Sequence, residues 1–277
     1  MKFKIIGDSC TDFVPEDLEK DYIVSVPLTI DVDNYEIVDD ESFDQADFLK
    51  RVAEYQGCPK SACPSPETYM ESFEDAENVY VVTLSAQLSG SYNSAQLAKR
   101  MYQEEHPDTK IHVFDSKSAS SGQLLLAHLI EQYALSGMEF EKIVEKVTAF
   151  REKMQTTFVL ESLETLRKNG RLTGVKALVA SALNIKPYMK AVDGSIAQAG
   201  QARGIKKALG KMVDFVGEVG ENLTEKTVII ANCNCYERAK EVEKELMERY
   251  HFKESMIIDT RGISSLYAND GGVIVSF

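Results

Sequence analysis

The chain has 277 residues, 44% hydrophobic and 27% charged, which is enough for two domains or one large domain with a buried core. Its formal net charge of −13 excludes a general nucleic-acid binder, which would present a basic face. No apolar run approaches the ~20 residues that span a membrane, and the N-terminus lacks the apolar stretch of a signal peptide. Five cysteines without disulfide-framework spacing favour a reduced, cytoplasmic protein.

Short apolar runs alternate with helical patterns in the first half of the chain. This alternation predicts βαβ units and a parallel sheet with helices on both faces. The run at 23–30 contains Pro27, so it lies at a sheet edge or ends near that residue. We expect strands at 2–7, 23–30, 79–84 and 111–115, and helices at 43–56, 67–73, 91–105, 122–135 and 139–153.

The second half predicts a mixed sheet, because two strand-like runs flank the turn Asp193-Gly194 as in a hairpin. Its expected strands are 156–161, 185–190, 195–199, 227–233, 255–260 and 272–277, and its expected helices are 163–169, 175–183, 204–216 and 236–250. The sequence therefore predicts an α/β protein of two domains: an α/β/α parallel-sheet domain over 1–155 and a second α/β domain with a mixed sheet over 156–277.

Small polar residues follow three of the predicted parallel strands, at 8–9, 85–91 and 115–121. Ligands of parallel sheets bind beyond the carboxyl ends of the strands, so we expect the site there. In the segment 79–94 a strand runs into Ser89-Gly90-Ser91 and then into a helix, which gathers hydroxyls and free N–H groups that suit an anionic oxygen group. An ordinary helix N-cap explains the same residues.

The proline-punctuated segment 60–67 reads as a loop ahead of a helix. Ser65 is placed to cap that helix, with Pro66 at its first position. The functional interpretation is that Ser61 presents its hydroxyl to the same pocket as Ser89.

Catalytic and nucleotide motifs are not found. The chain has no G-x-S-x-G elbow, its four histidines lie in no triad-like context, and neither nucleotide-binding glycine fingerprint occurs. Cys233-Asn234-Cys235 has no second Cys/His pair, so it is poor evidence for a metal. Arg171 follows a predicted helix C-cap, and Arg203 is either an anion ligand or a surface charge.

Taken together, the segments resemble the DegV family of bacterial fatty-acid-binding proteins over nearly the whole chain. No single motif is decisive, but their order and spacing make the resemblance strong. The matching segments are Asp8-Ser9 with Asp12, Val26-Pro27-Leu28, Pro64-Ser65-Pro66, Leu88–Ala95, Asp115-Ser116 with Ser121-Gly122, Lys168–Thr173, Ile185-Lys186-Pro187 and Arg203–Leu209.

The resemblance implies a carrier that holds one long-chain fatty acid in a buried tunnel between two α/β domains, with no catalytic residue, cofactor or metal of its own. In the family, a Thr-Ser pair before Gln-Pro-Ser and the Ser of Leu-Ser-Gly hold the carboxylate. Members can present the acid to a separate ATP-dependent kinase, which makes an acyl phosphate. The implied ligand-binding residues are Ser61, Ala62, Ser89 and Gly90, and those implied around the head group or facing a partner are Arg171, Arg203 and Tyr267.

This chain departs from the family pattern at three places, which concern the head group and the hand-over to the kinase. Ser61-Ala62-Cys63 stands where the family has Thr-Ser-Gln, so the first hydroxyl is kept and the second is lost. Tyr267 stands where the family has the His of His-x-Gly-Pro-Gly, and Asn169 replaces the first Gly of Gly-Gly-Arg. Fatty-acid binding is therefore better supported than delivery to the kinase.

Two other classes of protein stay open. An acyl- or phosphoryl-transfer enzyme could use the same anion pocket, but it needs a base, metal or nucleotide site. A regulatory or interaction protein could hold the lipid as a structural part only. Candidates to line the tunnel are Leu88, Leu124, Leu125, Phe158, Leu178, Leu183 and Ile196.

Overall fold

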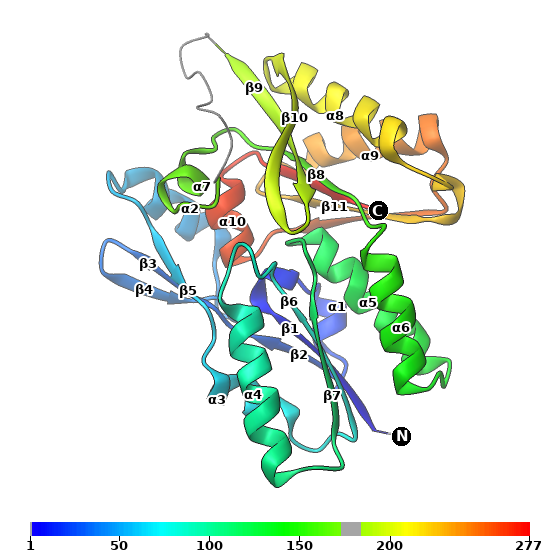
Figure 1. Ribbon diagram of the computed structural model, residues 1–277. Coiled ribbons are helices and arrows are strands. Elements are labelled where there is room, and N and C mark those ends of the chain that lie inside the picture. The colour runs from blue at the N-terminus through cyan, green and yellow to red at the C-terminus, as the bar shows by residue number, and fades with distance from the viewer. Residues whose placement is uncertain (1, 173–183) are drawn as a thin grey trace.

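Helices cover both faces of a four-stranded parallel sheet built from the first part of the chain (Figure 1). The computed structural model describes residues 2–172 and 184–277. Because successive strand residues point to opposite faces, Ile5 packs with α5 and α6 while Ile6 packs with α3 and α4. The sheet order is β2 (Ile23–Val26), β1 (Phe3–Asp8), β6 (Asn78–Thr83) and β7 (Lys110–Asp115), and the helices are α3 (Pro66–Phe73), α4 (Ser91–Glu105), α5 (Ser121–Leu135) and α6 (Phe140–Arg151).

A six-stranded mixed sheet is built from the second part of the chain. All its neighbouring strands are antiparallel except β11 and β12, which run parallel. Helices α8 (Ile205–Val219) and α9 (Tyr236–Tyr250) pack on one face. The sheet order is β10 (Ser195–Arg203), β9 (Ile185–Val192), β8 (Thr156–Val159), β13 (Val273–Ser276), β11 (Thr227–Asn232) and β12 (Glu254–Asp259).

Helix α5 lies between the two sheets, and this position explains why most of its residues are apolar. Residues 121–127 of α5 are buried, whereas Leu135 at the end of the helix is exposed. Leu124 and Leu126 of α5 belong to one core cluster with Tyr80 of β6 and with Ile229 and Ile258 of the mixed sheet. The helix therefore joins the two sheets through apolar packing.

A third, antiparallel sheet of three short strands lies beside these layers (Figure 1). Its strands are β4 (Tyr35–Val38), β3 (Thr29–Val32) and β5 (Lys60–Ala62), in that order. The remaining elements are α1 (Pro15–Leu18), α2 (Gln45–Glu54), α7 (Glu164–Lys168), α10 (Gly262–Ala268) and the short 3-10 turns Ser9–Thr11 and Leu223–Glu225.

The predicted fold class is confirmed, with a parallel sheet first and a mixed sheet second. The bounds predicted at 91–105 and 236–250 match α4 and α9. The run predicted at 23–30 forms two strands: β2 lies at a sheet edge and ends at Val26, as Pro27 predicted, and β3 joins a different sheet. The helix predicted at 175–183 lies outside the described residues, and the domain limits at 155 and 156 stay a prediction.

Four of the helices and strands in the described residues were not predicted. One of them lies where we expected a loop. Residues 60–62 form the edge strand β5, which pairs with Thr29–Asp31 of β3. That pairing is long-range, so the local sequence carries no sign of it. The unpredicted elements are β4, β5, α1 and α10.

Helix α10 begins on a buried carboxylate from a distant part of the chain. Asp39 accepts the N–H of Gly262 at 2.7 Å and that of Ile263 at 2.9 Å, which satisfies two first-turn donors of the helix. A Cβ atom at position 262 would lie 2.7 Å from Cγ of Asp39, so this close approach requires glycine. Sequence separation, not local propensity, explains why α10 was missed.

We predict that Asp39→Ala lowers the free energy of unfolding by about 3 kcal/mol, because it strands two buried N–H groups. Urea denaturation measures this loss. The control is Asp40→Ala, which removes side-chain bonds to exposed Ser42 only and should cost below about 1 kcal/mol. Equal losses in the two variants would contradict the role of Asp39.

Candidate functional site

A pocket lies between the carboxyl end of the parallel sheet, the mixed sheet and α10. The pocket is narrow, with a cavity volume of about 90 Å³, and the space between its walls, part of it open to solvent, is about 730 Å³. Its lining in the described chain is Cys10, Leu84, Leu88 and Lys117–Ser120 from the loops of the parallel sheet; Thr156, Phe158, Leu160, Ala191, Gly194, Ser195, Ile196 and Ile274 from the mixed sheet and its turns; and Leu166, Arg171, Ile263, Ser264, Tyr267 and Ala268.

The pocket wall is mostly apolar because of strand alternation. Thr156 and Phe158 of β8 line the pocket, while Val159 packs in the core beneath α8 and α9. Ile274 pairs with Phe158 in the sheet, and both side chains line the pocket. Such a surface suits a hydrocarbon.

One end of the pocket is lined by Arg171 and Tyr267, whereas Ser61, Ser89 and Gly90 lie beside it and are not part of the lining. The hydroxyls of Ser61 and Tyr267 lie 3.1 Å apart. Nε of Arg171 donates to the carbonyl oxygen of Leu88 at 3.1 Å, and its Cζ lies 5.8 Å from the centre of the Tyr267 ring. We call Ser61, Leu88, Arg171 and Tyr267 the polar end. It joins four segments that are far apart in the sequence: β5, the loop before α4, the turn after α7 and α10.

The turn after Leu88 continues this end toward α4. Ser89 Oγ accepts the N–H of Ser91 at 3.2 Å and donates to Ser91 Oγ at 3.2 Å. A Cβ atom at Gly90 would lie 3.0 Å from Sγ of Cys63, so the β5 segment packs closely against this turn. First-turn amides of a helix have no intrahelical partners, and they favour an anion.

The buried carboxyl group of Asp8 holds the same turn in place through hydrogen bonds. Asp8 accepts the N–H of Leu84 at 2.8 Å and Nε2 of Gln123 at 2.9 Å. Burial raises the pKa of Asp8 to about 6, and the hydrogen bonds from Gln123, Leu84 and Ser91 lower it only in part. The turn that carries Ser89 is therefore positioned by a group that titrates near neutral pH.

A second buried carboxyl group lies beneath the pocket wall. Asp12 accepts Oγ of Ser120 at 2.5 Å and the N–H of Arg261, next to α10, at 2.8 Å. Burial raises the pKa of Asp12 to about 7, against hydrogen bonds from Ser120, Ser264 and Arg261. Ser120 has φ of 54°, a backbone region that residues other than glycine rarely adopt, and its bond to Asp12 helps to hold it there.

The structure brings some of the predicted site residues together and leaves others apart. Ser61, Arg171 and Tyr267 meet at the polar end, but Arg203 is exposed at the end of β10, opposite Ile185. Ala62 is exposed on β5. Among the candidate tunnel residues, Leu88, Phe158 and Ile196 line the pocket, Leu124 and Leu125 lie in the core around α5, and Leu178 and Leu183 lie outside the described residues.

Sequence reasoning missed how the site is held. Cys63 was noted only as a replacement, yet it contacts the turn at Gly90. Asp39 carried no local signal, whereas Asp12 was already part of a recognised motif. The contact of Ser61 with Tyr267 spans 206 positions, so spacing could not reveal it.

Neither Ser61 nor Ser89 is paired with a basic side chain in the part of the chain that the structure describes. In the described chain, the side-chain partner of Ser61 is the Tyr267 hydroxyl and that of Ser89 is the Ser91 hydroxyl. Neither partner is a base at neutral pH, so neither activates a serine.

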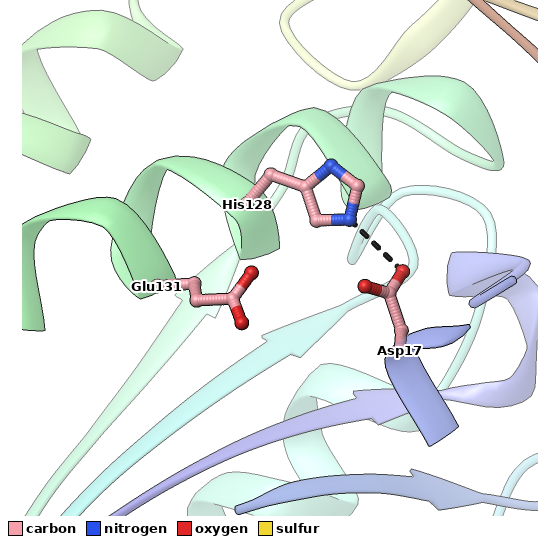
Figure 2. A group of neighbouring side chains, drawn as sticks. All are labelled: Asp17, His128 and Glu131. Carbon is pink, nitrogen blue, oxygen red and sulfur yellow. Dashed lines mark hydrogen bonds and ion pairs between the residues drawn. The ribbon is translucent and has the colours of Figure 1, made fainter. Parts of the chain in front are cut away.

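Asp17, His128 and Glu131 form a separate cluster where α1 meets α5 (Figure 2). Nε2 of His128 lies 2.9 Å from Oδ2 of Asp17. The ammonium of Lys20 lies 3.0 Å from Asp17 and 2.7 Å from Glu131, so the carboxylates already share a cation. Their spacing would suit a metal ion, but an ion would have to displace Lys20. The cluster acts as an ion-paired tether between α1 and α5.

The fold and the pocket define a class of α/β proteins in which a parallel and a mixed sheet enclose a pocket between them. The model of the DegV protein family matches residues 2–277, so the chain belongs to the DegV family. A DegV domain-containing protein of Streptococcus pneumoniae is 38% identical over 280 residues, covering 100% of this chain and 99% of that protein.

Two solved structures are similar over nearly the whole chain. A DegV family protein of Ruminococcus gnavus, refined with vaccenic acid, has 52% identity and a TM-score of 0.96, with 99% of each chain covered. The fatty acid kinase (Fak) B3 protein of Streptococcus pneumoniae, loaded with linoleic acid, has 37% identity and a TM-score of 0.92, with 100% of this chain and 99% of that chain covered. In the described residues, no helix is both long and apolar enough to cross a membrane.

We predict a pH-dependent difference between the wild type and Asp12→Asn. The pKa of Asp12 is raised on folding, so its stabilisation is complete below the ordinary value of 3.8 and is lost as the pH rises through about 7. The wild-type advantage in free energy of unfolding should therefore be larger at acidic than at neutral pH, by roughly 3 kcal/mol. Denaturation across this pH range measures it.

Asp17→Asn is the matched control with the opposite sign. Burial raises the pKa of Asp17, but the hydrogen bonds and charges of His128 and Lys20 outweigh burial and lower it. The stabilisation from Asp17 is therefore present at neutral pH and lost in acid. If both variants changed the pH dependence in the same direction, the burial argument for Asp12 would be wrong.

Proposed function

We propose that the protein binds one long-chain fatty acid in the pocket, with the acyl chain along the apolar wall and the carboxylate at the polar end. The observation that carries this proposal is the pocket itself: Phe158, Ile196 and Ile274 line its wall, and it meets hydroxyls and a guanidinium at one end. The relatives with vaccenic and linoleic acid support it.

The carboxylate needs several donors, because a buried charge without partners is costly. We assign this role to the hydroxyls of Ser61 and Ser89 and the amides at Gly90, as charge-assisted donors; the Ser89 proton turns from Ser91 to the carboxylate when the acid binds. Tyr267 and Arg171 surround them, and the Tyr267 hydroxyl compensates for the hydroxyl that Ala62 lacks. Arg203 is assigned no contact with the head group.

The acyl chain supplies most of the affinity. Each buried CH₂ contributes ~0.8 kcal/mol, so a chain of roughly 16 carbons gains about 12 kcal/mol before ordering costs. Such a ligand stays bound through purification. The protein is then a carrier without catalysis of its own.

The carrier would present its acid to a separate fatty-acid kinase. The name of the similar Streptococcus pneumoniae protein, fatty acid kinase (Fak) B3, supports this step. The rival is a regulatory protein in which the lipid is structural. Tyr267 bears on the choice, because its hydroxyl is bonded to Ser61 at the polar end.

We predict that freshly purified wild type carries one acyl chain per protein, and that Ser61→Ala with Ser89→Ala loses most of it, because two head-group donors are removed. Mass spectrometry of the denatured protein counts the chains. Ser65→Ala is the matched control: it removes only the N-cap of α3, so it should retain the lipid. Full retention by the double variant would reject the assigned head-group role.

We also predict that the loaded protein, mixed with a bacterial fatty-acid kinase and ATP, yields an acyl phosphate. Omitting either protein should abolish the product, which is detected as its hydroxamate. Loaded protein whose acid stays unreacted with an active kinase would instead favour the lipid-filled regulatory protein.

A further inference from the structure

Four buried hydroxyls form a line from the core to the pocket wall. Oγ of Ser121 lies 2.8 Å from Oγ of Ser276, which lies 3.0 Å from Oγ1 of Thr156, which lies 2.7 Å from Oγ of Ser118. All four residues are buried. Ser118 and Thr156 line the pocket, so the line ends at the space proposed for the acyl chain.

Ser121, at the end of the line away from the pocket, determines the direction of the hydrogen bonds along it. Each hydroxyl has one proton to donate. In the described chain, the hydroxyl of Ser121 has one partner, Ser276, so it donates there or leaves a buried donor unsatisfied, which is costly. Ser276 then donates to Thr156, and Thr156 donates to Ser118.

This direction leaves the proton of Ser118 for the pocket. Its one remaining acceptor in the described chain is the carbonyl oxygen of Ala119, 3.5 Å away, at the limit of a hydrogen bond. The neighbouring Ser120 already donates to Asp12, and the ammonium of Lys117 is paired with Glu152. The proton of Ser118 is therefore held only by this long bond to Ala119, inside a mostly apolar wall, and can turn to a ligand.

We propose that Ser118 and Thr156 form a second polar subsite that recognises a hydroxyl group carried on the acyl chain. The inference rests on the proposed fatty-acid binding and adds a class of ligand, the hydroxy fatty acids. The ligand oxygen accepts the proton of Ser118, and the carbonyl of Ala119 accepts the proton of the ligand. A few placed polar groups in an apolar pocket are the usual source of such specificity.

The subsite makes recognition depend on position along the chain. A hydroxyl that reaches Ser118 gains hydrogen bonds, whereas a hydroxyl at any other carbon is buried against apolar wall and loses its bonds to water. If these hydroxyls served only to link α5 to β8 and β13, affinity would not depend on which carbon of the acyl chain carries the hydroxyl.

The test compares octadecanoic acid with a set of octadecanoic acids that each carry one hydroxyl at a different carbon. Delipidated full-length protein is titrated by competition against a fluorescent fatty acid. We expect one positional isomer to bind the wild type about tenfold more tightly than the plain acid, equivalent to ~1.4 kcal/mol, and the other isomers to bind more weakly than the plain acid.

The variants separate the subsite from its structural surroundings. Ser118→Ala with Thr156→Val removes both hydroxyls of the subsite, so within this variant the preferred isomer should bind no more tightly than the plain acid. Ser65→Ala, outside both the pocket lining and the line of hydroxyls, should keep the preference. The inference fails if no isomer is preferred over the plain acid, or if the double variant keeps the preference. If the wild type binds no fatty acid at all, the proposed function fails as well.

Discussion

Two buried carboxyl groups hold the start of helix α10, and the pocket depends on this contact. Asp12 accepts the N–H of Arg261 and Asp39 accepts the next two, so residues near the N-terminus hold a helix near the C-terminus. The helix brings Ser264 and Tyr267 to the pocket wall. Burial raises the pKa of both carboxyl groups. Placing them at the start of α10 therefore has a desolvation cost, which the hydrogen bonds from the backbone only partly offset.

The parallel sheet and the mixed sheet contribute different kinds of side chain to the site. The loops at the carboxyl end of the parallel sheet provide small polar residues, as expected for such sheets. The mixed sheet provides the apolar wall, because alternation along β8 turns Phe158 toward the pocket. Helix α5, packed between both sheets, keeps these two surfaces together. A long apolar ligand with one charged end fits this division.

Much of the fold could be predicted from sequence, and the reasons for the failures are physical. Strong local patterns gave α4, α9 and the parallel strands, and Pro27 marked the end of β2. Helix α10 and strand β5 depend on Asp39 and on β3, which lie far away in the sequence. The pattern pointed to Ser61 and Ser89, but the Ser61–Tyr267 contact and the close packing of Cys63 against Gly90 are tertiary.

The most direct test of the central claim is a crystal structure of the protein purified without added lipid. The account predicts continuous elongated density along Phe158 and Ile274, with a carboxylate within hydrogen-bond distance of the Ser61 and Ser89 hydroxyls. A pocket that contains only water, or an acyl chain whose carboxylate ends away from Ser61 and Ser89, would contradict it.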